Sequence, residues 1–169
     1  IPFGGINEQD AAIGTGSTIY NEADKLYYTF YTGHKDQLNP GDSREMVMVA
    51  TSPDFKKWTK NKTFYLKGAD YGYEKNDFRD PFVFRGDDNL YHMIVACKKS
   101  GKGVLAEWTS ADLKSWEHKG VFMQCMWDRF YECPDVFKMG DWWYLVYSEI
   151  HEAVRRVQYF KGRTLDELK

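Results

Sequence analysis

Three short stretches of the sequence decide the fold, because each repeats one pattern that ends in an aromatic residue. They read Gly16-Ser17-Thr18-Ile19-Tyr20, Asp80-Pro81-Phe82-Val83-Phe84 and Cys133-Pro134-Asp135-Val136-Phe137. A second aromatic residue follows the end of each stretch after seven positions, at Tyr27, Tyr91 and Tyr144. Polar and turn-forming residues fill the gaps, as is typical of a β-hairpin connection. Each repeat is therefore expected to begin with two antiparallel strands.

A second pair of matching segments extends the repeat. Residues 50–58 and 108–116 share a Thr-Ser-x-Asp core and end at Trp58 and Trp116. In the first repeat this segment lies between strands expected at 45–50 and 63–66, and in the second between strands expected at 103–108 and 120–123. Four short antiparallel strands in about 50–60 residues are typical of a β-propeller blade. We therefore predict that the two tryptophans hold neighbouring blades together.

The number of elements predicts an all-β fold and a partial β-propeller. Residues 14–67 and 78–124 are expected to form complete four-stranded blades, 131–169 an incomplete blade, and 1–5 the end of a preceding blade. Propellers close with about four to eight blades. We therefore expect the chain to be a fragment of a single propeller domain, with the missing blades as its partners. An open all-β sandwich is the alternative.

The composition excludes several classes of protein. A length of 169 residues fits one domain, and an aromatic content of 17% favours β-sheets. The net charge of −2 offers no basic surface for nucleic acid or an anionic membrane. No apolar run approaches the roughly 18–20 residues of a membrane span. Neither nucleic acid nor a membrane is therefore expected as a partner.

The cysteines and histidines predict no metal site and no cofactor. Cys97, Cys125 and Cys133 form an odd set without a Cys-x-x-Cys spacing, so neither a zinc site nor a disulfide framework is indicated. The four histidines are scattered without metal-ligand spacing. Because the thiols are unpaired and no signal peptide is visible, we expect a cytoplasmic protein, with secretion as the alternative.

Carboxylates lie directly before two of the repeated first strands. In a propeller these strands line the central axis, which brings Asp80 and Glu132 towards one mouth. The two residues are one position out of register, so a bulge or turn at Cys133-Pro134 is needed for them to face the same side. Paired carboxylates among aromatic rings are typical of glycoside hydrolysis. Alternatively, Asp80 forms an Asp-Pro turn or pairs with Arg79, and Glu132 pairs with Arg129.

The same segments resemble the motifs of family 32 glycoside hydrolases, the invertases, levanases, inulinases and related fructosidases. Phe78-Arg79-Asp80-Pro81 resembles the family's Arg-Asp-Pro motif, and Glu132-Cys133-Pro134-Asp135 resembles its Glu-Cys motif. Thr15-Gly16-Ser17 and the strand at 26–33 resemble the Ser-Gly-Ser region and the strand after it. The motifs occur in the family's order and cover about residues 14–148.

This resemblance implies a five-bladed propeller that cleaves fructosyl linkages of sucrose or fructans by a retaining double displacement. It implies that Glu132 is the general acid/base and that Asp80 is the transition-state stabiliser.

The resemblance also implies the roles of the surrounding residues. Arg79 would hold the acid/base and the sugar in place, Cys133 would pack beside Glu132, and Ser17 would line the donor subsite. We also expect Trp127, in the loop before Glu132, to contact the substrate.

One part of the family pattern is not found in the chain. The family's nucleophile is the Asp of an Asp-Pro pair upstream of the Ser-Gly-Ser region, whereas Asp80 is the only Asp followed by Pro here. Because the covalent step needs that nucleophile, we predict that the 169-residue chain alone has negligible fructosidase activity. Alternatives are a non-catalytic carbohydrate-binding propeller and a related furanosidase, an arabinosidase or a fructosyltransferase. An Asp-Pro pair some 40–60 residues before Gly16 in the gene would support an enzyme.

Overall fold

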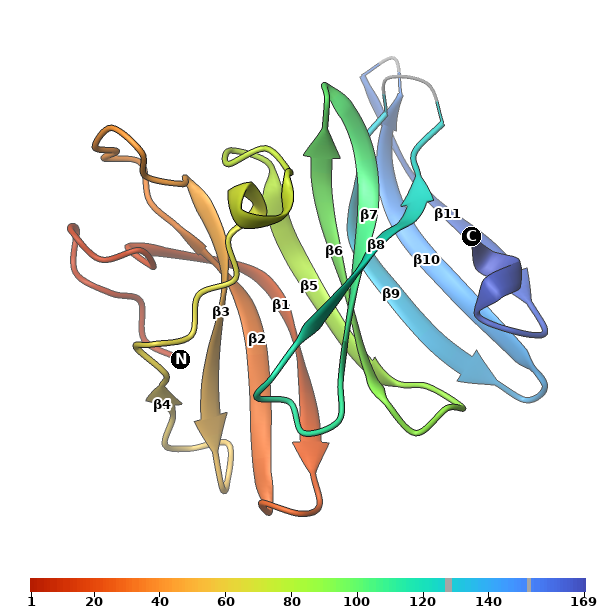
Figure 1. Cartoon of the computed structure of the whole chain (residues 1–169), viewed down its shortest axis with the longest axis horizontal. Helices are drawn as coiled ribbons and strands as arrows, with labels where there is room; N and C mark the ends of the chain where they lie inside the picture. Colours follow the sequence, from red (N-terminus) through yellow and green to blue (C-terminus); the bar gives the residue numbers. More distant parts are fainter. Residues whose placement is uncertain (127–128, 152) are drawn as a thin grey trace.

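A computed structural model describes residues 1–126, 129–151 and 153–169 of the chain. The described residues form three antiparallel sheets that lie side by side (Figure 1). The first sheet contains β1 (Ala12–Asn21), β2 (Leu26–His34), β3 (Glu45–Ser52) and β4 (Thr59–Lys60). The second contains β5 (Phe78–Arg85), β6 (Tyr91–Lys99), β7 (Lys102–Ser110) and β8 (Glu117–Gln124). The third contains β9 (Tyr131–Met139), β10 (Trp142–His151) and β11 (Val154–Gly162).

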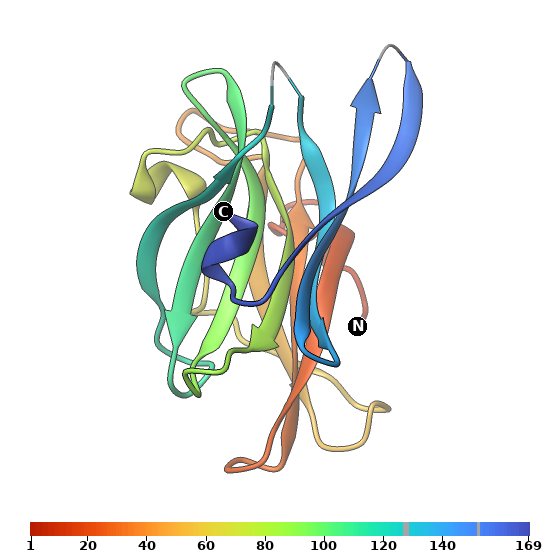
Figure 2. The same cartoon turned by 90° about the vertical axis from the view of Figure 1, so that its right-hand side faces the viewer.

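The all-β class and the division into two four-stranded sheets and one shorter sheet are confirmed. Within each sheet the strands follow one another in sequence order. The first strands β1, β5 and β9 lie next to one another, as the blades of a propeller require and the alternative sandwich does not. The described residues also form two short 3-10 helices, η1 (Gly68–Tyr71) before β5 and η2 (Asp166–Leu168) near Lys169. Figure 2 shows the same sheets turned by 90°.

The seven-residue spacing of the aromatic residues corresponds to hairpins, as predicted. Tyr20 pairs with Tyr27 across the first hairpin, and their rings lie 4.8 Å apart. Phe137 pairs with Tyr144 in the third. In the second hairpin the register is shifted by one, so that Phe84 pairs with His92 and its ring stacks on the imidazole.

Apolar side chains fill the spaces between adjacent sheets. Phe30 of β2, Phe78 of β5 and Trp108 of β7 belong to one buried cluster between the first and second sheets. The ring of Trp116 lies 5.3 Å from that of Phe30, which confirms that this tryptophan joins neighbouring sheets. Trp58, by contrast, packs against a small cluster that contains Tyr31, Met48 and Ala50 of its own sheet.

The fourth strand of the first sheet is shorter than predicted and lies earlier. β4 covers Thr59–Lys60 only, and Leu66 forms an isolated bridge with Val47. The cause is Asn61, whose side-chain oxygen accepts the N–H of Thr63 at 2.9 Å and turns the chain out of the sheet. The strand expected at 63–66 is therefore absent from the described structure.

The N-terminal segment is not paired with any described strand. Residues 1–5, expected to close a preceding blade, lead into a turn in which the N–H of Gly4 donates to the carbonyl of Asp10 at 2.7 Å. Within the described part of the chain, no helix has the length and apolar character that crossing a bilayer requires.

Candidate functional site

Each of the three first strands contains an irregularity near its beginning. The register shifts between Ile13 and Gly16 in β1, between Arg79 and Phe82 in β5, and between Val146 and Ser148 on the strand that pairs with β9. The expected bulge at Cys133-Pro134 is thereby confirmed. Asp80 and Cys133 occupy equivalent positions and both have left-handed backbone angles, with φ of 57° and 49°. The bulges therefore change the direction of the side chains where the carboxylates lie.

Hydrogen bonds between strands hold the three bulges together. The N–H of Cys133 donates to Oδ2 of Asp80 at 2.9 Å, which joins β9 to β5. The hydroxyl of Ser17 donates to the carbonyl of Pro81 at 3.0 Å and accepts the N–H of Val83 at 2.8 Å, which joins β1 to β5. Ser17 is therefore occupied by main-chain groups.

These strands surround a cavity of about 360 Å³. Its lining includes the predicted residues Arg79, Asp80, Glu132 and Cys133. Ser17 does not belong to that lining, whereas the neighbouring Thr15 does. The expected contact of Ser17 with a donor sugar stays a prediction. Trp127 lies outside the described residues. Further polar lining residues are Thr32, His34, Glu45 and Arg155.

Arg79 connects the carboxylates around the cavity. Its Nη2 donates to Oε1 of Glu132 at 3.2 Å, and its Nη1 donates to Oε2 of Glu45 and to Oδ1 of Asp77, both at 3.0 Å. The ring of Phe130 lies 4.3 Å below the guanidinium carbon, a cation–π distance. Burial opposes the charge, but Glu45 and the other carboxylates raise the pKa of Arg79, so the guanidinium stays charged.

Asp80 is held rigidly and is almost fully buried, with 6% of its surface exposed. Its own N–H donates to the hydroxyl of Thr32 at 2.9 Å, and that hydroxyl donates to the carbonyl of Thr15 at 2.9 Å. Burial raises the pKa of the Asp80 carboxyl above its usual range, although the Cys133 N–H and the Arg79 charge oppose this and Glu132 adds to it. The carboxyl group is thus fixed in place, and no cation among the described residues pairs with it directly.

Glu132 lies between two arginines. Oε1 accepts from Arg79, and Oε2 accepts from Arg155 at 3.2 Å. The alternative pairing with Arg129 is wrong, because Arg129 binds both oxygens of Glu149 at 3.0–3.1 Å. Glu149 belongs to β10 and is itself buried, with 1% of its surface exposed.

Cys133 lies beside both carboxylates. Its sulfur lies 3.7 Å from the hydroxyl of Thr15. Burial and the negative charge of Asp80 raise the pKa of the Cys133 thiol, so that it stays protonated. A neutral thiol at this position supplies bulk and a weak dipole next to Glu132 without another charge.

Sequence reasoning missed Glu45 and Arg155. The signal for Glu45 was a charged residue directly before five apolar residues of one strand. Its carboxylate is buried, and a buried charge needs a partner. Arg155 lies twenty-three residues after Glu132, and only the β10–β11 hairpin brings the two together.

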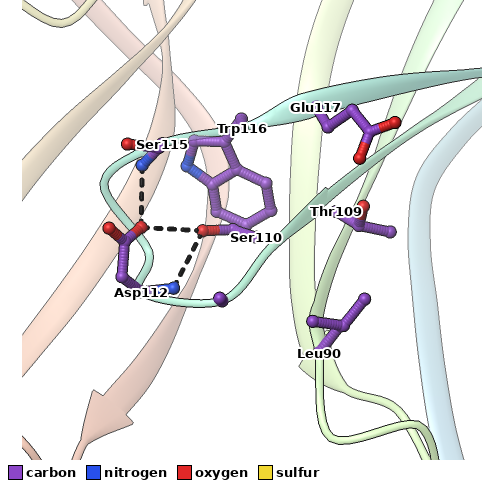
Figure 3. A pocket seen from close by; sticks show the side chains of 8 residues that line it. Leu90, Thr109, Ser110, Asp112, Ser115, Trp116 and Glu117 are labelled. Atoms are coloured by element: carbon purple, nitrogen blue, oxygen red, sulfur yellow. Dashed lines mark hydrogen bonds between the residues drawn. The ribbon is translucent and has the colours of Figure 1, made fainter.

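A second cavity, of about 470 Å³, lies at the β7–β8 turn and has a structural explanation (Figure 3). Asp112, one of the two acidic residues that line it, uses one carboxylate oxygen to accept the N–H groups of Lys114 and Ser115, both at 2.8 Å. Asp54 makes the same contacts with Lys56 and Lys57 in the first sheet. This Asp therefore stabilises the repeated turn.

The fold and the site together define a class of protein. Propeller-type sheets whose first strands carry two carboxylates and an arginine around one cavity are typical of enzymes that act on glycosides. The described residues contain no group of three or more His, Cys, Asp and Glu side chains able to hold a metal ion.

The comparison with protein families identifies the class more closely. The model of the glycosyl hydrolases family 32 N-terminal domain matches residues 6–168. The chain therefore belongs to this family.

Relatives and solved structures agree with this assignment. The chain is 28% identical to sucrose-6-phosphate hydrolase of Escherichia coli over 149 residues, which cover 84% of this chain and 29% of that protein. Sucrose-6-phosphate hydrolase of Vibrio alginolyticus is 38% identical over 65 residues, which cover 37% and 13% respectively. The structure of sucrose-6-phosphate hydrolase from Lactobacillus gasseri has the same fold, with a TM-score of 0.74 at 19% identity, over 95% of this chain and 34% of that one. The chain thus spans about a third or less of these relatives.

Proposed function

We propose that this chain is the part of a β-fructofuranosidase propeller that carries the acid/base Glu132 and the stabilising Asp80, and that further blades complete the active site. The observation that carries the proposal is their common cavity: both carboxylates line it, and Arg79 and the Cys133 N–H connect them. Relatives named sucrose-6-phosphate hydrolase, raffinose invertase and β-fructofuranosidase support a terminal fructosyl group as the substrate.

In this proposal each residue has a step in a retaining double displacement. In the first step, a nucleophile from outside this chain attacks the anomeric carbon while Glu132 donates its proton to the departing glycosidic oxygen. In the second step, Glu132 takes a proton from water, whose oxygen displaces the nucleophile. Asp80, fixed by the Cys133 N–H, accepts hydrogen bonds from fructosyl hydroxyls as positive charge develops on the sugar.

The test is Glu132→Gln in the complete protein. A general acid matters most for a poor leaving group, so we expect sucrose hydrolysis to fall by roughly a thousandfold. An aryl fructoside with a good leaving group needs little protonation, so its first step should persist as a burst of phenol. Added azide, which needs no general base, should then restore turnover as fructosyl azide.

A matched control is Glu107→Gln. Glu107 is another buried glutamate, with 10% of its side chain exposed, the same fraction as for Glu45. It pairs with His92 and lies outside the cavity. This variant should keep wild-type hydrolysis. Unchanged sucrose hydrolysis in Glu132→Gln would contradict the proposal, and so would a complete protein that binds sucrose without cleaving it. Release of fructose by the isolated 169-residue chain would contradict the need for an outside nucleophile.

A further inference from the structure

Two of the three carboxylates that contact Arg79 have no part in the proposed reaction. Glu45 and Asp77 share Nη1 of this arginine, and Nη2 is left for Glu132. The orientation of the guanidinium towards Glu132 therefore depends on what holds its other end.

Glu45 is the better anchor of the two. Its side chain is 10% exposed, against 24% for Asp77, which also pairs with Lys98 at 3.0 Å. The same Oε2 of Glu45 that accepts from Arg79 also accepts the N–H of Phe78 at 3.0 Å, and Phe78 is completely buried. Glu45 thus fixes Nη1 relative to the main chain at the start of β5, although it belongs to β3 of the neighbouring sheet.

We propose that Glu45 is a positioning residue that holds Arg79 in the orientation in which it reaches Glu132, and whose negative charge limits the effect of that cation on the acid/base. The proposal rests on the proposed function of Glu132.

Glu45 and Glu132 both pair with Arg79, so the charge of one affects how strongly this cation acts on the other. Glu132 faces Arg79 of β5, Arg155 of β11 and the nearby Asp80 and Cys133. Glu45 faces Arg79 and, through Oε1, Nδ1 of His34 at 3.6 Å. Among the described residues, removal of the Glu45 charge would leave Arg79 with one non-reacting carboxylate, which Lys98 already partly neutralises. The field of Arg79 at Glu132 would then favour the ionised form of the acid/base more strongly.

Glu45→Gln in the complete protein tests this inference. The amide has the same size, and its oxygen can still accept the Phe78 N–H, so the fold should persist. We expect kcat on sucrose to fall roughly tenfold with KM within about twofold, because the acid/base is less well placed. The basic limb of the kcat/KM profile should move to lower pH by on the order of half a unit, because the proton of Glu132 is lost more easily.

Glu45→Asp separates position from charge. It keeps the negative charge on a side chain one methylene shorter, so kcat should fall while the basic limb stays at its wild-type pH. Glu107→Gln, which removes an equally buried charge outside the cavity, should leave both kcat and the limb unchanged.

The outcomes distinguish this inference from the function on which it rests. A wild-type kcat and a wild-type basic limb in Glu45→Gln, with Glu132→Gln inactive, would overturn the role of Glu45 alone. A shift of the same size in Glu107→Gln would also overturn it. Full activity of Glu132→Gln would instead overturn the proposed function.

Discussion

Leu113 holds the second sheet against the first, and its truncation should have a measurable cost. It lies in the turn after β7, is 1% exposed, and belongs to the cluster that contains Tyr28 and Val49 of the first sheet. Its N–H donates to the hydroxyl of Ser110 at 2.9 Å, and its φ is 65°. Alanine makes the same main-chain bond and bears the same backbone strain as leucine. Leu113→Ala therefore removes only side-chain contacts.

The expected loss follows from the burial of this side chain. A fully buried leucine truncated to alanine costs about 3 kcal/mol, the sum of lost transfer free energy and the cavity left behind. With a urea m-value of about 2 kcal/mol per molar for a chain of this size, the unfolding midpoint should fall by roughly 1.5 M. The same loss lowers the Tm by about 6–12 °C. Tryptophan fluorescence during urea titration of the 169-residue chain measures the change.

The repeat supplies a matched control at Phe55. This residue occupies the equivalent turn of the first sheet, with a φ of 63°, but 55% of its surface is exposed. Phe55→Ala should cost less than about 1 kcal/mol in the 169-residue chain. In the complete protein the cost should approach that of Leu113→Ala, because a preceding blade would cover the ring. A Leu113→Ala midpoint no lower than that of Phe55→Ala in the 169-residue chain would refute the reasoning.

Two further predictions concern buried titratable groups. Burial disfavours the charged form of His92, but Glu107 at 2.8 Å and Asp88 at 3.1 Å raise its pKa in the folded protein. The stabilisation from these two pairs is therefore complete below the unfolded pKa of about 6.5. It is lost as the pH rises through the raised pKa of the folded state. His92→Gln should therefore flatten the fall of unfolding free energy above about pH 6.5, and an unchanged slope would contradict this. Asp80→Asn should lower sucrose hydrolysis by the complete protein roughly a hundredfold, because the negative charge that stabilises the transition state is lost. The unfolding midpoint should not fall, because asparagine tolerates the left-handed backbone and its side-chain oxygen can accept the Cys133 N–H. A midpoint as low as that of the core variant would show that the carboxylate is needed for folding.

The sequence was sufficient to predict the blades, because their signals are local. Hairpin spacing, turn residues and alternating apolar positions repeat along the chain, and each is set by residues close to one another. The strand expected at 63–66 failed for an equally local reason: the side chain of Asn61 competes with the sheet for main-chain N–H groups. The turn chemistry of a single residue was therefore decisive there.

The partners of the charged groups could not be predicted in the same way. Glu45 and Arg79 form a pair although they are thirty-four residues apart. Arg129 pairs with Glu149 rather than Glu132, because the pairing of β9 with β10 brings Glu149 to the Arg129 guanidinium. The sequence likewise did not predict that the close approach of β1 and β5 makes the Ser17 hydroxyl a bridge between two main chains. Such pairings depend on how sheets pack, which no single repeat encodes.

The repeat also explains why the candidate site lies where it does. Regular first strands would direct Asp80 and Glu132 to opposite faces, since the two residues differ by one position in register. At equivalent positions, Asp80 and Cys133 both adopt left-handed backbone angles, which cost free energy for residues other than glycine. The N–H of Cys133, at one strained position, is the group that holds Asp80, so the third sheet fixes the carboxylate of the preceding sheet. Strain at both equivalent positions is therefore linked directly to the geometry of the site.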